Sequence, residues 1–178
     1  MGLLKVGDIA PKIVAKDQDG NDVRLGEFAG KKVILFFYPK ANTPGCTAEA
    51  CNLRDYYKEL SDKGFKIIGV SADNEKSQKN FSDKFSFPYP LIPDTEKKVI
   101  KDYGVWGLKK MYGKEYEGIL RTTYVISEEG KIERVFDKVK TKTHAEQILE
   151  DYKKKRINHG TRERTKQGKI KSITTYIG

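Results

Sequence analysis

A run of six apolar and aromatic residues at positions 33–38 most constrains how this chain can fold. The run shows no polar alternation, which is typical of a strand buried on both faces of a parallel sheet. Pro39 ends the predicted strand because proline has no N–H to donate to a neighbouring strand. Thr43 and Pro44 then predict a helix, with Pro44 at its first position and Thr43 as the N-cap, whose hydroxyl accepts a hydrogen bond from the N–H of Cys46.

Cys46 falls in the first turn of that predicted helix. The unpaired N–H groups and the summed peptide dipoles of a helix N-terminus favour a thiolate there. A fall in the thiol pKa from about 8.5 to about 6 would raise the thiolate fraction at neutral pH roughly thirtyfold, but it would lower nucleophilicity about tenfold. Acidity alone therefore does not make an enzyme, and a catalytic Cys46 needs hydrogen-bond donors directed at the reacting atoms.

Cys51 is the only other cysteine and lies five residues further along the same predicted helix. The spacing of apolar residues turns Cys46 inward and Cys51 more outward. In an ideal helix, Cα atoms five residues apart are separated by about 8.6 Å, whereas a disulfide needs less than about 7 Å. An intact helix therefore argues against a static disulfide. The alternative is a bridge that forms only when the first turns unwind, which would couple oxidation to local unfolding.

The rest of the chain alternates between strand and helix patterns, which predicts an α/β fold with a central mixed β-sheet flanked by helices. Trp106 and Tyr112 fall in a glycine-rich loop and are predicted to pack in the core or in a lid. The other predicted elements are an N-terminal β-hairpin (13–15 and 23–25) that adds to the sheet, a helix from Thr43 to about Gly64, a strand (65–70), a helix after 71–74, a short strand (89–92), a short helix (96–103), a second hairpin (124–127 and 132–136), and a last helix that begins at Thr143.

Other classes of cysteine site fit the sequence less well. A Cys/His hydrolase needs a positioned base, and the only histidines are His144 at a predicted helix start and His159 near the C-terminus. A zinc site would need two more soft ligands, and a thioredoxin-type oxidoreductase would show Cys-x-x-Cys. A non-catalytic interaction domain of the same fold is the alternative from another class, and it predicts that the thiols persist when peroxide is added.

The segment at residues 37–51 resembles the active-site segment of the peroxiredoxins, in particular of the bacterioferritin comigratory protein (PrxQ) subfamily. It contains the pattern Pro-x-x-x-Thr-x-x-Cys as Pro39, Thr43 and Cys46, with a second cysteine five residues on, as in atypical two-cysteine members. The resemblance continues through residues 104–107 and 121–126 and covers roughly residues 3–152. It implies a thioredoxin-like fold and a thiol-dependent peroxidase that reduces hydrogen peroxide and alkyl hydroperoxides.

The resemblance also implies a role for each matching residue. Cys46 would be the peroxidatic cysteine, which forms a sulfenic acid, and Cys51 the resolving cysteine of an intramolecular disulfide. Arg121 matches the family's active-site arginine, which favours the thiolate and holds a peroxide oxygen. Thr43 would hold its hydroxyl beside the sulfur, and Pro39 would shield the thiolate from water. No metal or organic cofactor is expected, and thioredoxin or a similar dithiol is the expected reductant.

The net charge of +10 is concentrated near the C-terminus. Residues 153–178 hold nine Lys or Arg and one acid, which leaves 26 bases and 24 acids in residues 1–152. We therefore expect a peroxiredoxin domain at 1–153, followed by a basic tail at 154–178. By composition this tail is solvated and disordered or a non-native extension, and the alternative is a basic arm for membrane or nucleic acid.

The sequence has no apolar segment long enough to span a bilayer and no apolar core of a secretory signal near its N-terminus. Two cysteines in a reducing compartment are more often redox-active than structural. We therefore expect a cytoplasmic protein with a hydroperoxide substrate, no nucleic-acid or membrane partner, and a monomeric or weakly dimeric state.

Overall fold

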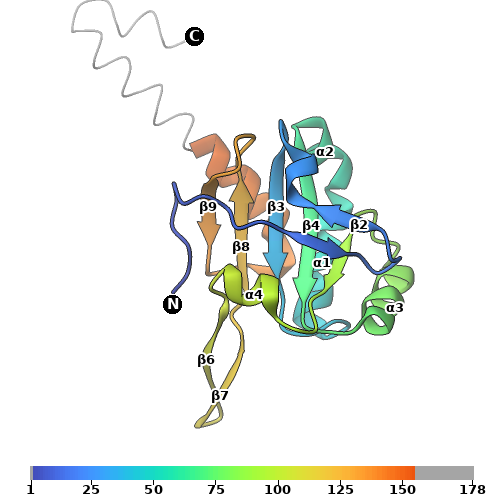
Figure 1. The fold of residues 1–178 in the computed structure, drawn as a ribbon, viewed down its shortest axis with the longest axis vertical. Coiled ribbons are helices and arrows are strands. Elements are labelled where there is room, and N and C mark those ends of the chain that lie inside the picture. The colour runs from blue at the N-terminus through green and yellow to red at the C-terminus, as the bar shows by residue number, and fades with distance from the viewer. Residues whose placement is uncertain (1, 155–178) are drawn as a thin grey trace, which may run out of the picture. The chain divides into compact units, whose positions relative to one another are not determined.

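The computed structural model describes residues 2–154, so the predicted tail lies outside the described residues apart from Lys154. The chain divides into two compact units, Met1–Lys142 and Thr143–Gly178. The first unit is built on a five-stranded sheet with strand order β5-β4-β3-β8-β9 (Figure 1). This mixed α/β architecture confirms the predicted fold class.

The central strand is β3, Lys32–Phe37, which runs parallel to β4, Phe65–Ser71, and antiparallel to β8, Thr122–Ile126. The predicted apolar run is buried throughout, as its lack of polar alternation requires. Alternate residues serve the two faces of the sheet. Leu35 and Phe37 join the main apolar cluster on one face, and Phe36 and Tyr38 stack on the other with ring centroids 5.4 Å apart.

The edge strands of the sheet are β5 and β9. Strand β5, Leu91–Pro93, pairs parallel to β4, while β9, Ile132–Phe136, pairs antiparallel to β8. The second predicted hairpin is therefore confirmed as β8 and β9. The C-terminal end of β3 and the N-terminal end of β8 meet at the lower end of the sheet in Figure 1.

The first helix begins at Pro44, as the sequence predicts, but it is shorter than expected. Helix α1, Pro44–Asp55, is interrupted at Tyr56, whose ψ of 10° departs from the helical value of about −42°. A separate helix α2, Tyr57–Asp62, follows and ends two residues before Gly64, so the single helix predicted to reach Gly64 is wrong. Helix α3, Glu75–Phe85, is capped by the side chain of Asn74, and helix α4 covers Lys98–Asp102.

Two small hairpins lie outside the central sheet. Strands β1, Val14–Lys16, and β2, Asp22–Arg24, form a two-stranded sheet of their own, so the predicted hairpin exists but does not add to the central sheet. Strands β6, Trp106–Met111, and β7, Lys114–Ile119, form a second hairpin that extends from the lower end of the sheet in Figure 1. The predicted glycine-rich loop is thus wrong. Tyr112 lies at the hairpin turn with 97% of its surface exposed, and Trp106 is half-buried.

The remaining elements are short or belong to the second unit. Leu25–Phe28 and Thr141–Thr143 form 3-10 turns. In the second unit, residues 144–154 are helical, as the sequence predicts for the segment after Thr143. Within the described residues, none of the helices is both long and apolar enough to cross a bilayer.

Candidate active site

Cys46 lies in the first turn of α1, directly after the loop that follows β3. The thiol is free, and only 1% of the residue's surface is exposed. The loop is fixed from β4, because the carboxylate of Asp73 accepts hydrogen bonds from the N–H of Ala41, at 2.7 Å, and from the hydroxyl of Ser71, at 2.6 Å. The helix N-terminus therefore has a defined position at the end of the sheet.

Arg121, immediately before β8, reaches the sulfur from the neighbouring strand. Its Nη2 lies 3.4 Å from Sγ of Cys46, and its Nη1 donates to Oε1 of Glu49 at 2.6 Å. The resemblance to the peroxiredoxins implies that Arg121 and Cys46 come together, and the structure places them in contact. One guanidinium thus spans a thiol and a carboxylate that are three residues apart on the same helix.

The charges of Glu49 and Arg121 are set by burial and by each other. Glu49 has no exposed surface, and burial raises the pKa of its carboxyl from 4.5 to about 7, although the nearby Arg121 opposes the rise. Burial alone would lower the pKa of Arg121, but Glu49 and the Cys46 sulfur outweigh burial and raise it. The guanidinium therefore stays charged beside the sulfur.

Two neighbours shape the space around this guanidinium. A Cβ atom on Gly45 would lie 3.3 Å from Nη2 of Arg121, so the absence of a side chain there leaves room for the contact with Cys46. Lys109 of β6 donates from Nζ to the carbonyl oxygen of Ile119 at 2.9 Å. Burial and the charge of Arg121 lower the pKa of Lys109, while the Cys46 sulfur opposes this, so a second cation lies within electrostatic range of the thiol.

Thr43 is the N-cap residue of α1, with extended backbone, but its side chain does not make the predicted bond. The hydroxyl donates to the carbonyl oxygen of Lys40 at 2.8 Å and does not accept from the N–H of Cys46. The predicted cap bond is therefore wrong. Since the single hydroxyl proton of Thr43 is committed to Lys40, its oxygen is available as an acceptor.

Cys51 lies on the same helix and is half-buried, with a free thiol. Burial raises the pKa of this thiol, and the nearby Arg54 opposes the rise. With α1 continuous from Pro44 to Asp55, the two thiols are not bridged, as the helical spacing predicts. Pro39 is half-buried in the loop after β3.

The sequence interpretation missed Glu49, Gly45, Asp73 and Lys109. Glu49 had the clearest signal, because it lies three residues after Cys46, a spacing that places both side chains on one side of a helix. The signal for Asp73 was its place directly after a parallel strand, where polar groups gather at the carboxyl edge of a sheet. Lys109 had none, because its role depends on a hairpin that the sequence did not predict.

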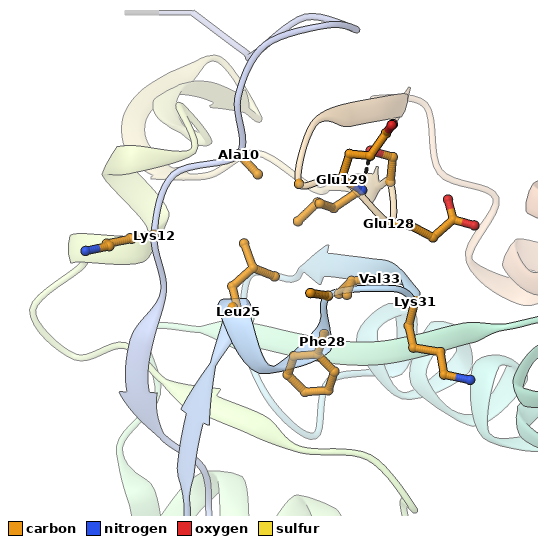
Figure 2. A pocket seen from close by; sticks show the side chains of 13 residues that line it. Ala10, Lys12, Leu25, Phe28, Lys31, Val33, Glu128 and Glu129 are labelled. Carbon is orange, nitrogen blue, oxygen red and sulfur yellow. Dashed lines mark hydrogen bonds between the residues drawn. The ribbon is translucent and has the colours of Figure 1, made fainter.

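A pocket of about 260 Å³ lies away from these residues, where β3 begins and β8 ends (Figure 2). None of the five predicted site residues lines it. Its wall is apolar and its rim charged; the side chains involved include Leu25, Phe28, Val33, Lys12, Lys31, Glu128 and Glu129. The chemistry of the cysteines belongs to the opposite end of the sheet.

A thiol at a helix N-terminus, in contact with a guanidinium, is suited to attack an electrophilic atom while the cation holds the developing negative charge. On this mixed sheet, such a site defines a thiol-based oxidoreductase of the thioredoxin-like class. The AhpC/TSA family model matches residues 6–135, and the chain belongs to this family, as a peroxiredoxin of the Bcp/PrxQ group. Proteins of this group are thiol-dependent peroxidases, which act on a peroxide and use a thiol reductant.

Sequence relatives support this assignment over most of the chain. The chain is 45% identical to peroxiredoxin Bcp of Escherichia coli K12 over 149 residues, which cover 84% of this chain and 96% of the relative. It is 40% identical to peroxiredoxin Bcp of Bacillus subtilis 168 over 150 residues, which cover 84% and 96% of the two chains. The resemblance predicted from residues 37–51 is confirmed.

Solved structures agree on the fold. Peroxiredoxin Q of Xanthomonas campestris superposes with a TM-score of 0.74 at 36% identity, covering 79% of this chain and 89% of that chain. BcpB of Mycobacterium tuberculosis gives a TM-score of 0.72 at 35% identity, covering 82% and 94%. A structure of the Xanthomonas campestris bacterioferritin comigratory protein, from complexes that concern its alkyl peroxide reduction activity, gives a TM-score of 0.74 at 36% identity. The match covers 79% of this chain and 90% of that chain. The predicted thioredoxin-like fold is confirmed.

Proposed function

We propose that Cys46 is the peroxidatic cysteine of this peroxiredoxin and that Arg121, Thr43 and Pro39 complete the peroxide site. The observation that carries the proposal is the 3.4 Å contact between Nη2 of Arg121 and Sγ of Cys46 at the start of α1. The Cys46 thiolate attacks one peroxide oxygen, the O–O bond breaks, and water or an alcohol leaves as Cys46 becomes a sulfenic acid. Arg121 holds the negative charge that develops on the oxygens.

Thr43 and Pro39 act on the same oxygens in this proposal. The oxygen of Thr43 accepts the hydrogen bond of the peroxide O–H, since its own proton is donated to Lys40. Pro39 contributes a half-buried ring without an N–H, which limits the access of water to the thiolate. Both residues precede α1 in the loop that follows β3, so they share one support with Cys46.

Cys51 resolves the sulfenic acid in this proposal. Its thiol attacks the oxidised sulfur of Cys46, a disulfide forms and water leaves. Because α1 holds the two residues apart, part of the helix must unwind first. An external dithiol, which we propose to be thioredoxin, then reduces the bridge and restores both thiols. A monomer in the reducing environment of the cytoplasm suffices for this cycle.

The test follows free thiols and intact mass after one equivalent of hydrogen peroxide. We expect the loss of two thiols per chain without covalent dimers. Replacing Cys46 with Ser should abolish peroxide turnover, and replacing Cys51 with Ser should leave one oxidation event and a trapped sulfenic acid. If the thiols of the wild-type protein persisted in peroxide, the protein would be the non-catalytic interaction domain instead. An unchanged steady-state rate of C51S with thioredoxin would refute the resolving role of Cys51.

A further inference from the structure

The β6–β7 hairpin carries much of the exposed apolar surface of this protein. Among residues 2–154, seven large apolar side chains are exposed, and four of them lie on this one hairpin: Leu108, Met111, Tyr112 and Tyr116. The two strands form a sheet of their own that extends from the lower end of the central sheet (Figure 1). A two-stranded sheet has little core of its own, so exposed apolar side chains do not help it to fold. They are suited to contact with another molecule.

Tyr112, at the tip of the hairpin, is the most unusual of these residues. Tyr112 and Gly113 both have a positive φ, of 53° and 79°, as a type I′ turn requires. Asn, Asp or Gly is favoured at the first of these positions, whereas a tyrosine is strained there. With 97% of its surface exposed, the ring gains almost no packing that would offset the strain. A strained residue that the fold does not need indicates a role outside the fold.

The strand pairing divides the side chains of the hairpin between two faces. Lys109 pairs with Tyr116 and Met111 pairs with Lys114, so these four side chains share one face. Leu108 precedes Lys109 and therefore lies on the other face. We call Met111, Tyr112 and Tyr116 the hairpin patch.

Lys109 shows that the face with Met111 and Tyr116 is the one on the side of the cysteine site. The stem of Lys109 crosses Gly118, where a Cβ atom would lie 3.2 Å from Cδ of the lysine. Its Nζ donates to the carbonyl oxygen of Ile119 at 2.9 Å and interacts electrostatically with the Cys46 sulfur. The hairpin patch is therefore continuous with the surface from which Cys46 is reached.

The dimensions of the patch favour a protein as its occupant over a small peroxide. A strand rises about 3.4 Å per residue, so Tyr112 lies roughly 10 Å further along the hairpin than Lys109. Hydrogen peroxide or a short alkyl hydroperoxide at Cys46 does not span that length. The catalytic cycle proposed above requires one protein at this site, the dithiol reductant, because its sulfur has to touch the bridge.

The charge around the patch specifies the partner further. Residues 108–114 contain Lys109, Lys110 and Lys114 and no acidic residue. A partner with acidic groups around an apolar contact surface complements this arrangement. Exposed aromatic residues and methionine are the side chains that such interfaces favour.

We propose that the hairpin patch is the docking surface for the reductant, a dithiol protein whose apolar contact surface is bordered by acidic residues. The inference rests on the proposed cycle of Cys46 and Cys51 and adds the surface that its last step uses. In that step a thiolate of the partner attacks one sulfur of the bridge, and a mixed disulfide forms as the other sulfur leaves. The second thiol of the partner then breaks the mixed disulfide, so the partner is oxidised to a disulfide and both cysteines return as thiols.

The test compares two reductants on the same bridge. Diamide forms the bridge by oxidising two thiols without any peroxide reaction, and its reduction is followed with thioredoxin and, separately, with dithiothreitol, which is too small to need a docking surface. Tyr112→Asn removes the ring and places a residue there that suits the turn. We expect Y112N, at thioredoxin concentrations below saturation, to slow reduction about tenfold, the loss typical of an aromatic contact in an interface. Reduction by dithiothreitol should keep the wild-type rate.

Two further variants test the face and the charge. Met111→Gln and Leu108→Gln are a matched pair, because the two side chains are 53% and 63% exposed on opposite faces of one hairpin. We expect M111Q to slow reduction by thioredoxin about tenfold and L108Q to leave it unchanged. Lys114→Glu reverses a charge beside Met111 and should slow reduction by thioredoxin without affecting dithiothreitol.

Four results would overturn the proposal. One is an unchanged rate of Y112N and M111Q with thioredoxin, and another is equal slowing with dithiothreitol, which would mean that the hairpin affects the bridge itself. The third is self-association of the wild type that these variants abolish while thioredoxin acts normally, which would make the patch an interface between copies. The fourth is slower oxidation by a long-chain hydroperoxide alone, which would make it a substrate surface.

Failure of the proposed peroxidase function gives a different result. In that case the thiols of the wild-type protein persist in peroxide, yet the bridge made with diamide is still reduced by thioredoxin. The ratio of the wild-type and Y112N rates with the two reductants then decides whether the hairpin patch binds the reductant.

Discussion

Arg121 uses two different nitrogen atoms for two partners on α1. Nη2 contacts Cys46 and Nη1 contacts Glu49, and the single ammonium nitrogen of a lysine cannot replace both. We expect R121K to lower the second-order rate constant for Cys46 oxidation about ten- to a hundredfold, the loss expected for one hydrogen bond to a charged group. Stopped-flow measurement of thiol oxidation by hydrogen peroxide gives this constant.

The exposed Arg24 at the end of β2 provides the control for this substitution. R24K should react at the wild-type rate, since it changes the same side-chain type away from the thiol. If R121K also reacted at the wild-type rate, while circular dichroism showed both variants folded, the guanidinium would not stabilise the transition state.

Glu49 makes the stability of the protein depend on pH. Because burial raises its pKa from 4.5 to about 7, the folded protein holds this proton more tightly than the unfolded chain between these values. Below pH 4.5 the Glu49 carboxyl is protonated in both states, so its burial costs the folded state no ionisation free energy. The protein loses stability as the pH rises to 7, because the unfolded chain releases this proton first. We expect E49Q to become more stable relative to the wild type over this range, by on the order of 2 kcal/mol.

Urea unfolding at pH 4.5 and at pH 7.5 measures this difference. Glu59 of α2 is exposed, so E59Q is the matched control and should show little change relative to the wild type between the two pH values. A stability difference between E49Q and the wild type that stays constant with pH would show that Glu49 is ionised to the same extent in both states.

The meeting of Cys46 and Arg121 is predicted through the resemblance to the peroxiredoxins, since an arginine at a strand edge is by itself usually a solvated charge. The sequence does not predict the burial of Glu49, since a carboxylate on a helix is usually solvated, and its partner Arg121 lies 72 residues away in the chain. The direction of the Thr43 hydroxyl was also beyond prediction. The same sequence around Thr43 allows its hydroxyl either to accept from an N–H of the helix or to donate to the carbonyl oxygen three residues earlier, as it does in the structure.

At the scale of elements, β4 passes close to its neighbours at Gly69. A Cβ atom there would lie 2.8 Å from Cδ2 of Leu91 and 2.9 Å from Cζ of Phe36, closer than real contacts allow. We expect Gly69→Ala to destabilise the protein by about 1–3 kcal/mol through overpacking. Urea unfolding measures this, with Gly26→Ala as the control, because Gly26 has no atom within 4 Å of its Cβ position. Equal stability of the two variants would contradict the crowding at Gly69.

The elements that the sequence predicts correctly have local signals, and the others depend on distant contacts. Residues 33–38 are apolar without alternation, and Thr43 and Pro44 mark a helix start, so β3 and α1 follow from the chain itself. The hairpin of β6 and β7 mixes lysine, glutamate and glycine, and its turn at Tyr112 needs a positive φ of 53° that tyrosine rarely adopts. The break at Tyr56 carries neither proline nor glycine to announce it.

For the whole molecule, charge separates the C-terminal segment from the rest. Deleting residues 154–178 removes eight bases and one acid and lowers the net charge from +10 to +3. The proposed catalytic residues all precede residue 122, so the deletion removes none of them, and salt at physiological concentration screens the charge that it does remove. We therefore expect the 1–153 variant to oxidise Cys46 within about twofold of the full-length rate constant.

The same deletion decides between the two interpretations of the basic segment. A basic arm that binds nucleic acid releases counterions from its partner, so affinity for a single-stranded oligonucleotide would fall steeply with salt and would be lost in the 1–153 variant. We expect only weak binding by the full-length chain, because the segment's charges alternate with polar residues and lack aromatic residues for base stacking except Tyr176. Fluorescence anisotropy at 50 and 200 mM salt measures both chains. Tight, salt-dependent binding by the 178-residue chain but not by the 1–153 variant would show that residues 154–178 bind nucleic acid. That result would contradict the expectation that this segment has no nucleic-acid partner.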